Sequence, residues 1–324
     1  MRLQLSSSYA FRIIPWIAPL LLLGCGVKDA PADDSVSDAD TDADADTDAD
    51  SDADSDTDTD SDTDSDTVCG DYPAPASGIT FACVPGGSFT MGCTPGQSSC
   101  GDDESPTFDV TLTHNLWVAV TEVTQDQYTS VVGTNPSNNT ACGGNCPVES
   151  IHWDDAAAYA NTMSDAEGLT KCYTCDGSSC VPSVDPYTCD GYRLATEAEW
   201  EFAARCGVDL TYSGSTLSSD VAWTGMNSGD TIHAVGTLAA NGCGISDMSG
   251  NVWELVQDLY GPYTADSKSD PSGQTTGSEH GLRGGGYSSR GGSAHVSERE
   301  STGLDVSGKA IGIRIARTGL PASR

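Results

Sequence analysis

Twelve cysteines in the second part of this 324-residue chain are the side chains whose spacing most directly indicates chemistry. They are Cys69, Cys83, Cys93, Cys100, Cys142, Cys146, Cys172, Cys175, Cys180, Cys189, Cys206 and Cys243. The run Cys172–Cys189 has the spacing of a four-thiolate zinc site. Two other pairs, Cys93–Cys100 and Cys142–Cys146, are close enough to close local loops. An even number in an exported protein is typical of disulfides, here up to six, and an oxidising compartment favours disulfides over zinc.

Other catalytic patterns are weaker. Ser289, Ser293 and His295 lie close in sequence, but no Gly-x-Ser-x-Gly elbow supports a hydrolase. The five histidines show no metal-binding spacing, and no phosphate-binding loop occurs in a supporting context. Six charged residues could form an active-site cluster, but we interpret them as buried ion pairs that hold long loops. They are Arg193, Glu197, Glu201, Arg283, Arg314 and Arg317.

The first residues indicate export. Arg2 and Arg12 flank a polar start, and the apolar run Ile13–Leu23 is too short for a comfortable membrane span. Leu-Leu-Gly-Cys, ending at Cys25, resembles the lipobox of bacterial lipoproteins. We therefore predict a lipoprotein signal peptide over 1–24, with lipidated Cys25 as the mature N-terminus, sorted to the outer membrane because no aspartate follows it. A plain secretory signal with an incidental Cys25 is the alternative.

An aspartate-rich segment follows. Residues 33–66 contain 17 aspartates and no basic residue, which is half of the net charge of −34. Without an apolar face the segment cannot form a core, and self-repulsion extends it. We predict that 25–78 is the lipidated N-terminus and a disordered stalk. A calcium-binding repeat is the rival interpretation, but the segment lacks the glycines that wrap a chain around an ion. The acidic remainder excludes nucleic acid as a partner.

The elements that position these residues begin with strands. Phe81–Gly92 has the pattern of a strand, a Gly-Gly turn and a second strand, and Phe108–Thr124 alternates as one strand. The segment Trp153–Gly168 predicts a helix with acidic residues at its start and glycine at its stop. Thr196 and Glu199 form a capping box for a second helix. From Cys206 onward, glycine and polar residues predict loops with few long elements.

Seven phrases occur in an order that resembles the formylglycine-generating enzyme family, the sulfatase-modifying factors. They are GGSFTMG (86–92), EVTQDQY (122–128), PVESIHWDDAAAYAN (147–161), RLATEAEWEFAAR (193–205), DMSGNVWEL (247–255), LRGGGY (282–287) and GIRIAR (312–317). The resemblance implies a compact, loop-rich α+β fold related to the C-type-lectin-like fold. It implies a domain over 79–317 with a tail over 318–324.

The resemblance also implies a chemistry that this chain lacks. Family enzymes oxidise a sulfatase cysteine with oxygen, using two cysteines after the Arg-Gly-Gly motif that bind copper(I), a soft metal suited to sulfur. Those positions here are Ser289 and Ala294. A hydroxyl and a methyl group cannot replace two thiolates, so we expect no copper and no oxidation by the family route.

Two further sites follow from the resemblance. Asp247, Gly250, Val252 and Glu254 match family positions that bind calcium, and carboxylates on a tight turn suit such a hard cation. Alternatively, Glu254 pairs with a buried arginine, Arg283 or Arg314, and Asp247 caps a turn.

The second site is the closing segment, Tyr287–Leu304, which the resemblance places along the family's substrate groove. Its small polar, tyrosine and arginine side chains make an adaptable contact surface, and an ordinary solvated loop is the alternative. The predicted groove residues are Arg283, Tyr287, Ser289, Arg290, Ser293, His295 and Arg299.

These observations favour a surface-anchored lipoprotein outside the cytoplasm, attached to the outer membrane by its N-terminal lipid. Its domain would bind a peptide, glycan or protein ligand without oxidising it. One alternative is an oxidoreductase of the family that acts on a protein cysteine or uses another metal. Another is a structural component of the cell envelope, which would have no saturable ligand.

Overall fold

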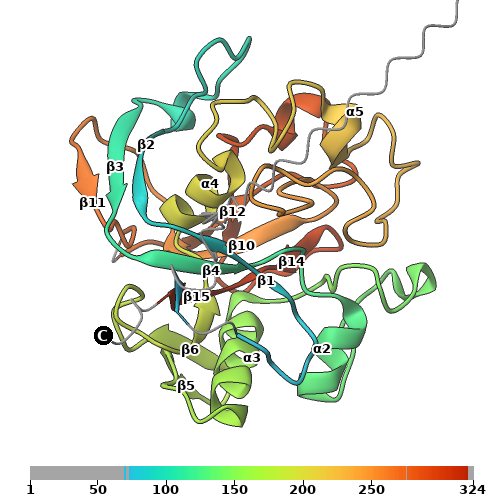
Figure 1. Cartoon of the computed structure of the whole chain (residues 1–324). Coiled ribbons are helices and arrows are strands. Elements are labelled where there is room, and N and C mark those ends of the chain that lie inside the picture. The colour runs from blue at the N-terminus through green and yellow to red at the C-terminus, as the bar shows by residue number, and fades with distance from the viewer. Residues whose placement is uncertain (1–68, 71–72, 275, 320–324) are drawn as a thin grey trace, which may run out of the picture. The chain divides into compact units, whose positions relative to one another are not determined.

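The computed structural model describes residues 69–70, 73–274 and 276–319 (Figure 1). The predicted signal peptide, Cys25 and the aspartate-rich segment 33–66 lie outside these residues. Within the described residues, no helix is long and apolar enough to cross a membrane. The α+β class predicted from the sequence is confirmed, because a few short helices accompany sheets whose strands pair mostly antiparallel.

A first sheet joins the two ends of the described chain. Its strands are β1 (Phe81–Val84), β4 (Asn115–Ala119), β15 (Ile315–Gly319) and β7 (Tyr192–Leu194). They lie in the order β1-β4-β15-β7, and every neighbouring pair is antiparallel. Strand β4 is therefore held between a strand from the start of the domain and a strand from its end.

A second sheet carries the motifs of the closing segment. Its strands are β10 (Trp253–Leu259), β12 (Glu279–Arg283), β13 (Arg299–Gly303) and β14 (Ile311–Ile313). They lie in the order β13-β12-β10-β14, with β14 parallel to β10 and the other pairs antiparallel. This region was expected to consist mainly of loops, and the seven-residue strand β10 shows that short strands also organise it.

Three smaller sheets complete the strands. They are β11 (Lys268–Ser269) with β3 (Phe108–Leu112) and β2 (Gly87–Met91), the hairpin β5 (Tyr173–Asp176) with β6 (Ser179–Pro182), and β8 (Ala222–Trp223) with β9 (Ser249–Gly250). The strand predicted over Phe108–Thr124 is two strands, β3 and β4, in different sheets. Thr113 turns the chain between them, because its amide N–H and its Oγ1 both bind the carboxylate of Asp270.

Four α-helices are present in the described residues. They are α2 (Gln125–Val132), α3 (Trp153–Ala166), α4 (Glu197–Arg205) and α5 (Ser218–Val221), with 3-10 turns η1 (Asp102–Glu104), η2 (Thr140–Cys142) and η3 (Gly291–Ala294). The helices predicted from Trp153 and after Thr196 are confirmed, including the Thr196–Glu199 capping box. Helix α2 was missed, although Thr124 and Gln127 form the same kind of capping box.

The helices lie on different sides of the first sheet. Helix α3 packs against β7 and α2, whereas α4 packs against β2, β10 and β12. Figure 1 shows α4 on one side of strand β4 and the pair α2 and α3 on the other. One buried apolar cluster contains Trp153 and Tyr159 of α3, and a second contains Trp200 and Phe202 of α4. Helix α4 is therefore the element that connects the core to the closing segment.

The domain extends beyond its predicted bounds of 79–317. Cys69 is buried, its carbonyl oxygen accepts the indole N–H of Trp117, and it forms a disulfide with Cys83. At the other end, Thr318 and Gly319 belong to β15, and the Thr318 hydroxyl donates to the carbonyl oxygen of Pro186. The predicted tail therefore begins too early.

All twelve cysteines of the described residues form disulfides. The pairs are Cys69–Cys83, Cys93–Cys100, Cys142–Cys146, Cys172–Cys189, Cys175–Cys180 and Cys206–Cys243. The two local pairs predicted from spacing are present. The alternative of a zinc site between Cys172 and Cys189 is wrong, because its four sulfur atoms are used in two disulfides. Six disulfides place the domain outside the cytoplasm, in an oxidising compartment.

Candidate ligand-binding surface

Two sequence motifs distant along the chain meet to build the closing segment. After β12, Gly284 and Gly285 adopt positive φ angles of 90° and 78°. A Cβ atom at Gly285 would lie 2.0 Å from the carbonyl oxygen of Ser293, so the backbones approach as only glycine allows. The N–H of Gly250 donates to the carbonyl oxygen of Gly284 at 2.7 Å. The Arg-Gly-Gly motif thus packs on the Gly-Asn turn and presents residues 287–294.

The two positions that correspond to copper ligands have other roles here. Ser289 closes a tight turn, in which its Oγ accepts the N–H of Gly286 at 3.0 Å. Ala294 is fully buried in an apolar cluster with Val221 and Ala222. Because every cysteine of the described residues is in a disulfide, no thiolate pair is available there either. A hydroxyl and a methyl group do not fit copper(I), which prefers soft sulfur ligands.

A contact surface nevertheless forms around Ser289. The N–H of Gly225 donates to the Ser289 carbonyl oxygen at 2.8 Å, which brings the loop after β8 beside the closing segment. Met226 on that loop is 78% exposed. Trp223, at the end of β8, stacks on His233 with ring centroids 3.8 Å apart. Methionine and tryptophan are enriched at binding interfaces. The residues that we call the closing-loop surface are Trp223, Met226, Tyr287, Ser289, Arg290 and Ser293.

Sequence reasoning missed Trp223 and Met226. The signal in the sequence is a pair of large apolar residues beside a run of glycine, serine, asparagine and aspartate. The structure leaves Trp223 half-buried at the end of β8 and Met226 exposed in the loop after it. Only the hydrogen bond between Gly225 and Ser289 shows that this loop and the closing segment share a surface.

Three of the seven predicted groove residues do not lie on this surface. Arg283 is fully buried, because its Nη2 donates to Glu201 at 2.6 Å and its Nη1 to Glu197 at 3.1 Å. His295 is buried against the ring of Tyr212. Arg299 is also buried, and it borders a different cavity of about 410 Å³ beside Glu197. The three side chains face inward because Arg283 and Arg299 pair with glutamates of α4 and His295 packs against Tyr212.

The charged residues of the helix phrase Arg193–Arg205 form buried ion pairs, as predicted. The pairs are Arg193–Glu199, Arg205–Glu201, Arg283–Glu201, Arg283–Glu197 and Arg299–Glu197. Three glutamates of α4, Glu197, Glu199 and Glu201, therefore hold three strands from different parts of the chain, β7, β12 and β13. Arg317 differs, because it is half-buried and its Nε donates to the carbonyl oxygen of Asp190 at 2.7 Å. These pairs are structural and fix the position of α4.

One residue of the cavity beside Arg299 has an unusual protonation equilibrium. Asp258 is buried, and its Oδ2 accepts the N–H of Glu197 at 2.8 Å. Burial, together with the nearby charge of Glu197, raises the pKa of Asp258 to about 8. Its carboxyl group is therefore mainly protonated at neutral pH. This proton removes one of the negative charges that would otherwise lie side by side at the start of α4, where Glu197 is already ionised in its ion pairs.

The predicted calcium residues surround a buried group of carboxylates. Glu254 is saturated, since Arg314 donates to both of its oxygens and the indole of Trp200 donates at 2.6 Å. The partner of Glu254 is thus Arg314, not Arg283. Asp247 accepts the N–H of Gly236 through Oδ2, but its buried Oδ1 has no hydrogen-bond partner among the residues that the structure describes. This unpaired oxygen is an observation that fits a cation.

Glu122 adds a third carboxylate to this group. Its two oxygens accept the Asn251 side chain and the N–H of Val252. Burial raises the pKa of Glu122 well above its usual range, and the charges of Asp247 and Glu254 raise it further. Within the described residues, no three His, Cys, Asp or Glu side chains are arranged as a metal cage, so main-chain oxygens would have to complete one.

Comparison with known proteins now identifies the class. Residues 72–319 match the family described as "Sulfatase-modifying factor enzyme 1-like domain", and this chain belongs to that family. Chaperone protein LppX of Paenibacillus barcinonensis is 36% identical over 203 residues, which cover 53% of this chain and 68% of that protein. The formylglycine-generating enzyme of Streptomyces coelicolor is 32% identical over 194 residues. The match covers 53% of this chain and only 52% of that enzyme.

Solved structures agree with this assignment. Treponema denticola variable protein 1 superposes with a TM-score of 0.66 and 29% identity, covering 74% of this chain and 95% of that protein. PvdO from Pseudomonas aeruginosa has a TM-score of 0.61 at 22% identity, covering 76% and 97% of the two chains. At that identity the second likeness shows the fold alone.

Proposed function

We propose that this protein is a lipid-anchored extracytoplasmic binding protein whose domain contacts a peptide, glycan or protein ligand without oxidising it. The observation that carries the proposal is the pair Ser289 and Ala294, of which one closes a turn and the other fills an apolar cluster. The exposed Met226 and Arg290 beside Ser289 supply an apolar and a cationic contact. The similarity to a protein named as a chaperone supports binding to a polypeptide.

The direct test is the family reaction itself. The purified protein, supplied with copper, oxygen and a Cys-x-Pro-x-Arg peptide, is expected to leave the peptide mass unchanged. A family enzyme with both copper cysteines is the positive control. Formation of formylglycine would overturn the proposal and favour the alternative of an oxidoreductase acting on a protein cysteine. Variants Met226→Ser and Arg290→Ser test the contact surface, because each should weaken the binding of a ligand to it. A purely structural envelope protein would show no saturable binding that these variants could weaken.

Attachment to the bacterial outer membrane rests on the lipobox at Cys25, which lies outside the described residues. The six disulfides agree with a position beyond the cytoplasm. Fractionation of cells that produce the Cys25→Ser variant separates the alternatives. A lipoprotein would be released from the membrane fraction by this change, whereas a protein with a plain secretory signal would be soluble before and after it.

We further propose one structural calcium ion, held by Asp247 and Glu122 together with main-chain oxygens near Gly250 and Val252. Asp247, Glu122 and Glu254 face one arginine, Arg314, so a divalent cation would neutralise the surplus negative charge. Calcium at a hundred times its Kd is expected to raise the Tm of chelator-treated protein by about 5–10 °C. The Asp247→Asn variant is expected to lose this shift.

The contrary outcome has its own pH signature. Without a cation, the raised pKa of Glu122 means that the carboxyl group of the folded protein keeps its proton at pH values where a free glutamate has lost it. The stability contributed by this group is then present below its ordinary pKa and is lost as pH rises through the raised value. A Tm that does not respond to calcium, and that falls with rising pH unless Glu122 is replaced by glutamine, would contradict the calcium proposal.

A further inference from the structure

An acidic groove of about 780 Å³ lies away from the closing-loop surface. The β5–β6 hairpin, the segment that follows it and the turn after β13 all contribute to its lining. The residues that define the acidic groove are Trp153, Asp154, Val181, Asp185, His280 and Asp305. Its volume is in the range of sites that bind small ligands or peptide side chains. None of Tyr287, Ser289, Arg290 or Ser293 lines it.

The charge of the groove is one-sided. Three aspartates line it, and no lysine or arginine is among its lining residues. Asp185 and Asp305 are exposed and come from two different segments of the lining. Asp154 is half-buried, with its Oδ1 accepting the N–H of Cys180 at 2.6 Å. Because low-dielectric walls concentrate the field of like charges, this groove attracts cations.

The groove also offers apolar contact. Val181 on the hairpin is 56% exposed and Leu304 in the turn after β13 is 40% exposed. Two further lining residues, Trp153 and His280, stack with an interplanar angle of 2°. Burial lowers the pKa of His280 to about 4, so its ring is neutral and does not offset the aspartates. His280 is 8% exposed, and its Nδ1 has no hydrogen-bond partner in the described residues.

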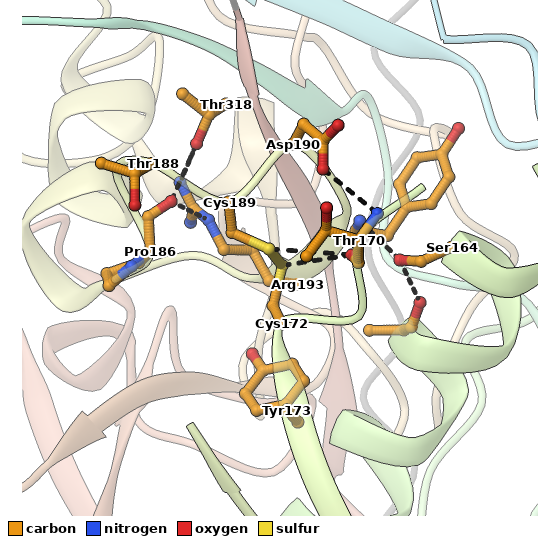
Figure 2. Close-up of a disulfide and its surroundings, with 12 residues drawn as sticks. Ser164, Thr170, Cys172, Tyr173, Pro186, Thr188, Cys189, Asp190, Arg193 and Thr318 are labelled. Carbon is orange, nitrogen blue, oxygen red and sulfur yellow. Dashed lines mark hydrogen bonds between the residues drawn. A yellow bond between two sulfur atoms is a disulfide. The ribbon is translucent and has the colours of Figure 1, made fainter. Parts of the chain in front are cut away.

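Two disulfides make the hairpin wall rigid. Cys175 and Cys180 are paired directly across β5 and β6 and form a disulfide. Figure 2 shows the second disulfide, Cys172–Cys189, at the base of this segment. Arg193 fixes the segment between them, because its Nε donates to the carbonyl oxygen of Pro186, another lining residue. A wall that is already ordered loses little conformational freedom on binding.

We propose that the acidic groove binds a basic polypeptide segment, with an apolar side chain between Val181 and Leu304 and lysine or arginine side chains at Asp185 and Asp305. The aspartate-rich segment 33–66 of the same chain is excluded as occupant by its like charge. A second copy of this acidic protein is disfavoured for the same reason. The site goes beyond the proposed function, because it uses none of the closing-loop residues.

The test measures binding of a short fluorescent peptide of repeating Lys-Leu-Ser units to the full-length protein at physiological ionic strength. The groove variant Asp185→Asn with Asp305→Asn keeps the shape of both side chains. The matched control, Asp230→Asn with Asp266→Asn, removes the same charge from exposed sites outside the groove. Both retain residues 33–66, so diffuse attraction of the peptide to that segment is equal in both. We expect the groove variant to weaken binding about tenfold and the control to change it less than about twofold.

The apolar contact has a separate variant. Leu304→Ser leaves the charge unchanged and is expected to weaken binding about threefold or more, whereas a Glu-Leu-Ser peptide should not bind. Equal losses in the groove variant and its control would show binding by net charge alone and overturn the inference. So would the lack of saturable binding to the unaltered protein. None of the groove variants alters a closing-loop residue, so failure of this test does not decide the role of the closing-loop surface.

Discussion

Replacing Arg314 by methionine is expected to lower the free energy of unfolding by about 3–5 kcal/mol, because it leaves buried carboxylates without their cation. Arg314 is 2% exposed. Its guanidinium donates to both oxygens of Glu254 and to the carbonyl oxygens of Ala119 and Ser246. It also lowers the pKa of the neighbouring Glu122 against the effect of burial. No smaller residue can replace these interactions.

Urea unfolding under non-reducing conditions measures this effect. Arg317→Met is the matched control, because Arg317 is half-buried, its Nε donates to the Asp190 carbonyl oxygen and its guanidinium lies over the ring of Tyr192. This change should cost about 1 kcal/mol. Adding Glu254→Gln to the Arg314→Met variant is expected to restore part of the loss, since it removes a buried charge. A loss for Arg314→Met as small as that for Arg317→Met would show that water or an ion already neutralises the carboxylates.

Replacing Cys206 and Cys243 by serine is expected to cost about 4 kcal/mol, the second large effect. This disulfide joins residues 37 positions apart and so removes more freedom from the unfolded chain than a local bridge does. Cys206 ends α4, and the chain it closes contains α5 and β8. The comparison is Cys142–Cys146, with a separation of 4, whose loss should cost about 2 kcal/mol.

The same urea titration measures both double variants. Alkylation of the unaltered denatured protein without reductant must first label none of the twelve cysteines, and alkylation after reduction must label all of them. Two labelled residues would mean one open pair. If the local bridge proved the more stabilising of the two, the loop-length explanation would be wrong, and native contacts around Cys142 would have to supply the difference.

Several features of this protein follow from the sequence alone. The capping box of Thr196 and Glu199 predicts the start of α4, because its hydrogen bonds join residues three apart. The order of the seven phrases indicates the sulfatase-modifying family, and the match over 72–319 confirms it. The prediction that copper is not bound at the family positions also comes from the sequence, since it depends only on which atoms the side chains of Ser289 and Ala294 carry.

Only the tertiary structure decided the partners of residues far apart. Alternating residues predicted one strand over Phe108–Thr124, but the bonds of Thr113 to Asp270 divide it between two sheets. The sequence left Glu254 a choice between Arg283 and Arg314, and packing places Arg283 against α4 and Arg314, 60 residues away, on Glu254. The groove walls and the six cysteine pairings are likewise determined by how sheets and helices pack. Local hydrogen bonds are encoded in neighbouring residues, whereas these contacts depend on where the whole chain brings its side chains.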